Sequence, residues 1–136
     1  MAQLCCAVLV GVAMTVMVLE LALRRLDGPS YIRVRQAEYY PFTWFIGAVF
    51  LLALISLTTY VVQARRSPHF RRALVALALV LVAVGITLAV NGPINLEQQA
   101  WTATAPPPDW SEIRDHWQLA HAVRTAALML ALACLM

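Results

Sequence analysis

The chain has 136 residues, and with 62% hydrophobic and only 12% charged residues it has too little polar surface for a soluble globular protein. All ten basic residues are arginines that form neither a tail nor a continuous stripe, so the net charge of +3 does not indicate nucleic-acid binding. The composition therefore predicts an integral membrane protein whose first partner is the lipid bilayer.

The length of the chain limits the number of membrane spans. One spanning helix needs about 20 apolar residues, so at most about four or five spans fit with short connections. We therefore expect a single domain over residues 1–136. Cys5, Cys6 and Cys134 lie in apolar stretches and are interpreted as small apolar helix residues, with a redox or acylation role as the alternative.

Residues 2–23 form the first apolar run. The run has no basic region before it and is longer than the core of a signal peptide, so it is interpreted as a retained span. Glu20 lies about one turn from its end, where Arg24 is the i+4 partner and can pair with it. The alternative is a role for Glu20 in a functional site, because carboxylates within spans are often functional.

The connection after the first span begins with Asp-Gly-Pro at residues 27–29, which predicts a turn. Ser30 is a good N-cap for a short helix over residues 30–40, which Pro41 helps to end. This helix is expected to lie in the membrane interface. Its Tyr39 is interpreted as an aromatic anchor at that interface, with a phenol in a functional site as the alternative.

Residues 42–64 and 73–90 are the second and third apolar runs, and the turn between them carries four arginines and no acid. The positive-inside rule places this turn in the cytoplasm, and four spans then place both termini there. The first connection, with four arginines against two acids, argues for the opposite orientation, but the compact turn is the stronger signal. We expect the inner membrane of a bacterium as the location.

The fourth span belongs to a helix over residues 110–136, which Asp109 or Ser111 can cap. This helix is longer than a bilayer requires, so part of it should project from the membrane. The predicted fold class is therefore all-α. We expect a four-helix membrane bundle with a short interfacial helix after span one and a long extramembrane loop before span four.

Three residues of the last helix, Trp117, His121 and Arg124, are spaced to share one face. Burying an arginine in a membrane is costly, so Arg124 should point into the bundle and find an acceptor. His121 is interpreted either as a buried histidine bonded to a neighbour or as a general base or ligand. The candidate acceptors for Arg124 are the oxygens of Glu20, Glu38, Asn91 and Asn95.

The segment over residues 91–95 can supply such oxygens. Pro93 removes a backbone donor and disfavours helix at Gly92, so the backbone is expected to leave the helix here. Irregular backbone at this depth is tolerated only where protein buries it or a wet cavity solvates it. The alternative is a helix stop followed by an ordinary polar turn.

The sequence contains no histidine cluster and no cysteine motif for zinc, haem or an iron–sulfur cluster. His116 and His121 are separated by about 140° around the helix, so they cannot chelate one ion from the same face. No cofactor is predicted. A mixed metal site of His121 with Glu20 or Glu38 is the alternative.

At these residues the chain resembles the small four-helix membrane proteins grouped with the anthrone oxygenases, many of which are known only as a domain of unknown function. Three features carry the resemblance, which spans nearly the whole chain. They are the Asn91-Gly92-Pro93-Ile94-Asn95 turn, the Asp109-Trp110 helix entry, and the helix bearing Trp117, His121 and Arg124.

The resemblance implies that an anthrone is oxidised by O₂ to an anthraquinone. Deprotonation of an acidic C–H gives an enolate that can pass an electron to O₂, so the protein need only position the substrate, take a proton and stabilise an oxyanion. His121 would be the base. Arg124, Asn91 and Asn95 would hold the oxyanion, and Trp101 and Trp117 would pack the rings. Further candidates for substrate binding are Glu20, Glu38 and Tyr39.

The alternative is a non-catalytic membrane protein that binds lipid, quinone or a partner subunit, or that forms a homo-oligomer.

Overall fold

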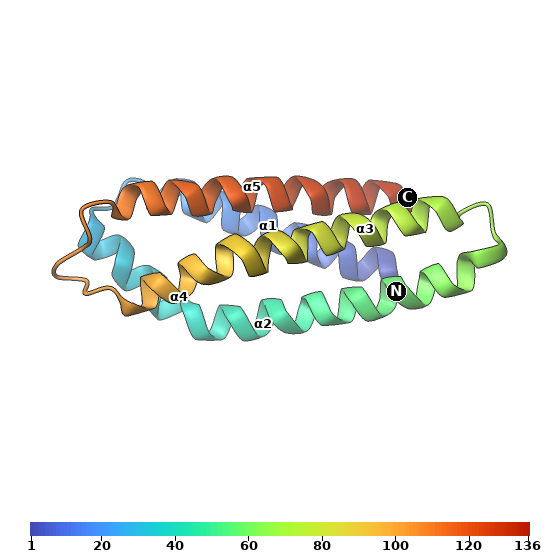
Figure 1. Ribbon diagram of the computed structural model, residues 1–136, viewed down its shortest axis with the longest axis horizontal. Helices are drawn as coiled ribbons and strands as arrows, with labels where there is room; N and C mark the ends of the chain where they lie inside the picture. The colour runs from blue at the N-terminus through green and yellow to red at the C-terminus, as the bar shows by residue number, and fades with distance from the viewer.

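The computed structural model describes residues 1–136, and the chain folds into four long helical segments without a sheet (Figure 1). All four are long and apolar enough to cross a membrane, which confirms the predicted all-α four-helix bundle. The elements are α1 (Ala2–Leu23), α2 (Gly28–Gln63), η1 (Ala64–Arg66), α3 (Phe70–Ile86), η2 (Thr87–Asn91), α4 (Gly92–Ala100) and α5 (Trp110–Leu135).

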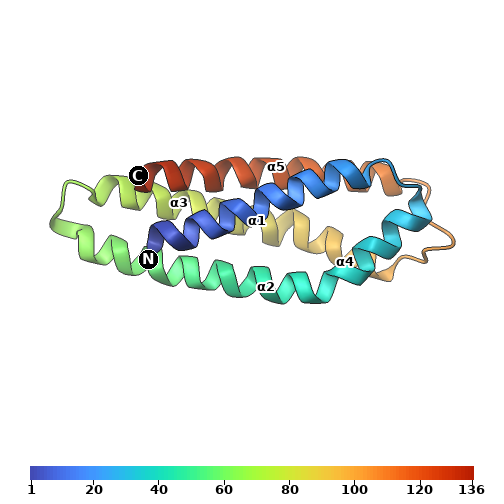
Figure 2. The same ribbon diagram turned by 180° about the vertical axis from the view of Figure 1, so that it is seen from behind.

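The helices pack in a ring in which α1 contacts α2 and α5, and α3 contacts the same two helices from the other side. Both termini lie at the end of the bundle that holds the turn between α2 and α3 (Figures 1 and 2). The opposite end, called the loop end below, holds the connection over residues 24–27 and the loop over residues 101–109. Helix α4 continues from α3 toward this loop end.

The core between the helices consists of small and branched apolar residues, among them Ala53, Ala76, Ala83 and Ala131, none of which is exposed. Small side chains let helix backbones approach closely, which is the usual means of helix association in a bilayer. Large leucine, isoleucine and valine side chains cover the outside of the bundle. Their exposure suits a protein embedded in lipid.

Helix α2 is one helix of 36 residues, so the expected short interfacial helix ending at Pro41 is wrong. Asp27 caps it, not Ser30: the Asp27 carboxylate accepts a hydrogen bond from the Ser30 backbone N–H at 3.1 Å. Pro41 lies inside the helix. Ending the helix there would leave several backbone groups without partners near the membrane, whereas proline removes one hydrogen bond, so continuing the helix costs less.

The chain also stays helical where it was expected to leave the helix at Pro93. One π turn, η2, joins α3 to α4, and the Gly92 N–H donates to the Thr87 carbonyl five residues back. Pro93 then falls in the first turn of α4, where a missing N–H costs little. The combined segment Phe70–Ala100 has 31 residues, or about 46 Å of helix, so α4 extends past the roughly 30 Å hydrocarbon layer.

Candidate functional site

A cavity of about 470 Å³ lies inside the bundle, between α2 and the other helices. Its wall is polar toward the loop end and apolar elsewhere. Cavities of this size are typical of small-molecule sites, which combine apolar walls with a few placed polar groups. The polar and ionisable residues of the wall are Glu20, Arg35, Glu38, Tyr39, Thr43, Thr87, Asn95, Gln99, Trp117, His121 and Arg124.

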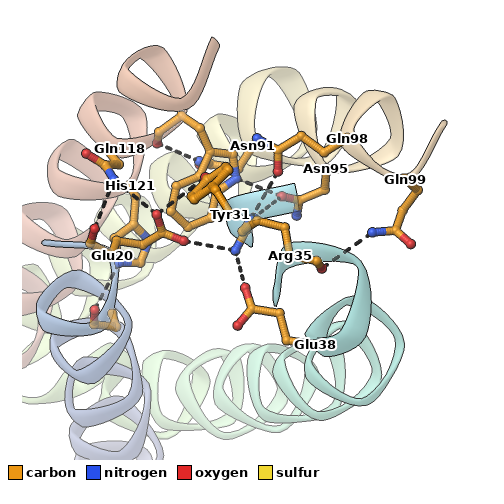
Figure 3. A network of polar contacts seen from close by, with 12 residues as sticks. Glu20, Tyr31, Arg35, Glu38, Asn91, Asn95, Gln98, Gln99, Gln118 and His121 are labelled. Carbon is orange, nitrogen blue, oxygen red and sulfur yellow. Dashed lines mark hydrogen bonds and ion pairs between the residues drawn. The ribbon is translucent and has the colours of Figure 1, made fainter. Parts of the chain in front are cut away.

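Arg35 of α2 is the centre of the polar network (Figure 3). One of its terminal nitrogens donates both to Glu20 Oε1, at 3.0 Å, and to Glu38 Oε1. The other terminal nitrogen donates to Asn95 Oδ1 at 2.8 Å, and Nε donates to Gln98 Oε1 at 3.1 Å. The side chain is 9% exposed, so this guanidinium is a buried cation that binds two carboxylates.

Glu20 of α1 is 3% exposed and is held on several sides. Besides Arg35, it accepts hydrogen bonds from Gln118 Nε2 at 3.0 Å and from the Tyr31 hydroxyl at 3.5 Å. The expected pairing of Glu20 with Arg24 is wrong. Arg24 follows the last turn of α1 and extends along the surface to Asp115, 2.9 Å away, so it does not reach the buried carboxylate.

Arg124 of α5 has no carboxylate partner. Its Nε and Nη2 lie 3.0 and 2.8 Å from His121 Nδ1, and its Nη1 lies 3.0 Å from Thr87 Oγ1. None of the four expected acceptors binds it, because Arg35, which enters from α2, already occupies Glu20, Glu38 and Asn95. Arg124 is thus a partly buried cation whose side-chain partners, a histidine and a threonine, carry no negative charge.

His121 is 1% exposed and uses both ring nitrogens. Its Nε2 lies 2.9 Å from the Ala13 carbonyl oxygen. A carbonyl oxygen can only accept, so Nε2 carries the hydrogen and Nδ1 is the acceptor for Arg124. In this arrangement His121 has no free lone pair for a substrate proton.

The Trp117 ring stacks on His121, with ring centroids 5.0 Å apart and planes 8° from parallel. Its Nε1–H donates to Asn95 Oδ1 at 2.8 Å. Asn91 lies behind this ring: its Nδ2 donates to the Trp117 carbonyl at 3.0 Å, and its Oδ1 is buried with no partner. The two asparagines therefore fix Trp117 from opposite sides, one through its ring and one through its backbone.

A comparison with protein families gives one match. The family model described as anthrone oxygenase matches residues 40–134. The chain belongs to the anthrone oxygenase family. No curated protein and no solved structure matches the chain.

The segment that matches the anthrone oxygenase family contains Asn95, Trp117, His121 and Arg124, whereas Arg35 and its two carboxylates precede it. Seven of the nine residues expected at the site line the cavity. The other two do not: Asn91 is buried behind Trp117, and Trp101 lies at the end of α4, where its carbonyl accepts from Gln36 Nε2 at 2.8 Å. The seven are Glu20, Glu38, Tyr39, Asn95, Trp117, His121 and Arg124.

Sequence reasoning missed Arg35, Gln98 and Thr87 as members of the site. The expected break at Pro41 placed Arg35 on a surface helix, when α2 in fact carries it into the bundle. One signal was available, because Glu20 is an acid within an apolar run and needs a cation of sufficient reach. Arg35 also precedes Glu38 by three residues, the spacing of a helical ion pair.

The side chains that could ligate a metal are engaged by protein partners. Glu20 and Glu38 both bind Arg35, while His121 binds Arg124 and a carbonyl. No group of three or more histidine, cysteine, aspartate or glutamate side chains has the placement of a metal site. The donor set for a mixed histidine and carboxylate site is therefore not assembled.

Proposed function

We propose that the protein binds a lipophilic aromatic substrate with one ionisable oxygen, such as an anthrone or a related phenol or quinol, and oxidises it with O₂. Membership of the anthrone oxygenase family supports this class of reaction. The observation that carries the proposal is Arg124, a partly buried cation in the wall of a mostly apolar cavity without an acid bonded to it.

A substrate oxyanion would supply the missing charge at Arg124. A buried, unpaired cation is unfavourable, and a guanidinium has five N–H groups, of which His121 and Thr87 leave some free. Hydrogen-bond donors already aimed at the place where negative charge develops are among the strongest contributors to catalysis. Arg124 would hold the enolate oxygen, and His121 and Thr87 would fix the guanidinium plane.

Glu38 is the better candidate for the proton acceptor. His121 would become a base only if Arg124 released its Nδ1. Glu20 is fully engaged, whereas Glu38 binds only Arg35, through one oxygen, and also lines the cavity. In this assignment Glu38 takes the proton and His121 is a positioning residue for Arg124.

The reaction balances without a further reactant. Loss of a C–H proton to Glu38 gives an enolate, which passes one electron to O₂. The resulting superoxide and carbon radical combine into a peroxide anion that takes the proton back from Glu38. Cleavage of the O–O bond with loss of the second C–H proton releases water, so a CH₂ group and O₂ become a carbonyl and water.

The test is O₂ uptake by the protein in lipid nanodiscs with anthrone under air, corrected for uptake in empty nanodiscs. We expect Arg124→Gln to lower kcat about 10²–10³-fold and Glu38→Gln about 10²–10⁴-fold. His121→Gln should lower kcat much less than Arg124→Gln does and leave the pH profile unchanged, because the glutamine oxygen can still accept from Arg124. Exposed controls are Arg71→Gln and Glu97→Gln, which should leave the rate unchanged. Equal rates for Arg124→Gln and Arg71→Gln would reject the proposal.

Binding without turnover is the second candidate function. It is favoured by the completeness of the polar network, in which Glu20 and His121 have no free position. Such a protein would retain an anthraquinone or quinone in its cavity but consume no O₂ with anthrone. Saturable binding together with background O₂ uptake would select this function.

We also propose that the turn between α2 and α3 and both termini face the cytoplasm of a bacterial inner membrane. That turn carries Arg65, Arg66, Arg71 and Arg72 without an acid. The arginines at the loop end are partly neutralised, since Arg24 pairs with Asp115, Arg35 with two glutamates and Arg114 with Asp115. The arginines at the loop end are therefore a weaker argument for the opposite orientation than their number suggests.

A further inference from the structure

The cavity is longer than a fused aromatic ring system requires. Its wall follows α2 from Glu38 to Leu54, which is about 24 Å of helix. The polar groups end near Arg124 and Thr87. Beyond them the wall is apolar and reaches Leu9, Phe50, Leu54 and Leu128.

The cavity also has openings toward the lipid. Leu19, Leu51 and Leu88 line it, yet their exposed fractions are 51%, 59% and 72%. Side chains that face both a cavity and the outside of the bundle lie at an opening between helices. Because these residues belong to membrane-spanning segments, the opening leads to hydrocarbon.

Part of helix α2 borders both the cavity and the outside of the bundle. Its residues 40–45 are exposed although Phe42 and Thr43 line the cavity. Gly47 lines the cavity as well, and outside its own stretch of helix no heavy atom lies within 4 Å of the position a Cβ would take. A glycine here leaves open space beside the apolar wall that α2 contributes.

We propose that the cavity takes an amphiphilic aromatic molecule, with its ionisable ring oxygen at Arg124 and a hydrocarbon tail along α2 past Gly47. The molecule enters sideways from the bilayer. This inference rests on the proposed function, which places the oxygen at Arg124. Moving the tail from lipid to an equally apolar wall gains little binding free energy. The tail therefore binds only if the wall leaves room for it, and Gly47 provides that room.

Gly47→Phe tests the path, because it fills open space and improves helix propensity. Gly11→Phe is the matched control, since Gly11 is also exposed with no heavy atom within 4 Å and does not line the cavity. The probes are a hydroxyanthraquinone, which has the ionisable oxygen, and the same hydroxyanthraquinone with a decyl chain; neither can be oxidised further at the ring carbonyls. Binding is followed in nanodiscs by quenching of tryptophan fluorescence, with empty nanodiscs to correct for partitioning into lipid.

We expect the wild-type protein and Gly11→Phe to bind both probes with similar affinity. Gly47→Phe should weaken binding of the decyl probe about tenfold or more, as overpacking does in a filled site, and weaken binding of the probe without the chain much less. Rejection of the decyl probe by wild type, or equal behaviour of the two phenylalanine variants, would overturn the inference. Failure of the probe without the chain to bind wild type would reject the proposed substrate class as well. If Gly47→Phe weakens binding of the decyl probe as expected but the wild-type protein consumes no O₂ with anthrone, this inference stands and only the proposed oxidation is rejected.

Discussion

At the scale of single residues, the two arginines of the site differ in their partners: Arg35 binds carboxylates and Arg124 does not. Arg35 is buried and Arg124 is partly buried, and their guanidinium carbons lie 4.5 and 5.9 Å from the centroid of the Trp117 ring. Arg35 is neutralised by Glu20 and Glu38, whereas Arg124 faces a histidine and a threonine. Because of this difference in partners, we propose that Arg35 is a structural cation and that Arg124 binds the substrate anion.

Arg35→Gln should destabilise the protein by about 3–5 kcal/mol, because it leaves two carboxylates without their buried partner. The control is Arg33→Gln, two residues earlier on the same helix and exposed. Denaturant unfolding in detergent measures both. A similar stability for the two variants would contradict the role of Arg35 as the centre of the network.

At the scale of elements, the π turn η2 places Thr87 against Arg124. A Cβ on Gly92 would stand 3.0 Å from the Thr87 carbonyl oxygen, which is too close for the turn to remain as it is. Gly92→Ala should therefore displace Thr87 and lower stability. Gly85→Ala, at an exposed position with open space, should raise it by up to about 1 kcal/mol through helix propensity. The unfolding temperatures of Gly92→Ala and Gly85→Ala test this expectation. A higher unfolding temperature for Gly92→Ala than for the wild type would argue against this geometry.

The start of α2 should respond to pH. Hydrogen bonds from the side chain and the backbone N–H of Ser30 hold the pKa of Asp27 below its ordinary value. This contribution to stability is complete above the unfolded-state pKa of about 3.9 and is lost as the pH falls through the lower folded-state pKa. Asp27→Asn keeps a capping side chain and should remove that acid dependence. An unchanged pH profile of unfolding in Asp27→Asn would contradict the assignment.

At the scale of the whole molecule, the termini and the arginine-rich turn lie at one end of the bundle and the loop over residues 101–109 lies at the other (Figure 2). Single cysteines at Ser67 and Thr104, in a chain with Cys5, Cys6 and Cys134 changed to alanine, report the orientation. An impermeant thiol reagent should label Thr104→Cys in intact cells and Ser67→Cys only after the membrane is opened. The reverse labelling pattern would invert the proposed topology.

The four spans could be predicted from the sequence because apolar runs of sufficient length have few other solutions. The shared face of Trp117, His121 and Arg124 followed from helical spacing, and all three line the cavity. The hydrogen-bond partners of these residues could not be predicted, since they depend on how the helices continue at two prolines. Pro41 and Pro93 read as helix ends, yet both lie in continuous helix, and this continuity brings Arg35 inward and keeps Asn95 beside Trp117.

The central claim is that Arg124 binds the ionised oxygen of the substrate, and the ionisation of a bound phenol tests it most directly. A hydroxyanthraquinone changes colour when it loses its proton, so its pKa can be read in nanodiscs that hold the protein. We predict that wild-type protein lowers the pKa of this ligand relative to empty nanodiscs, and that Arg124→Gln binds it without that shift. An equal shift in both proteins, or none in either, would contradict the account.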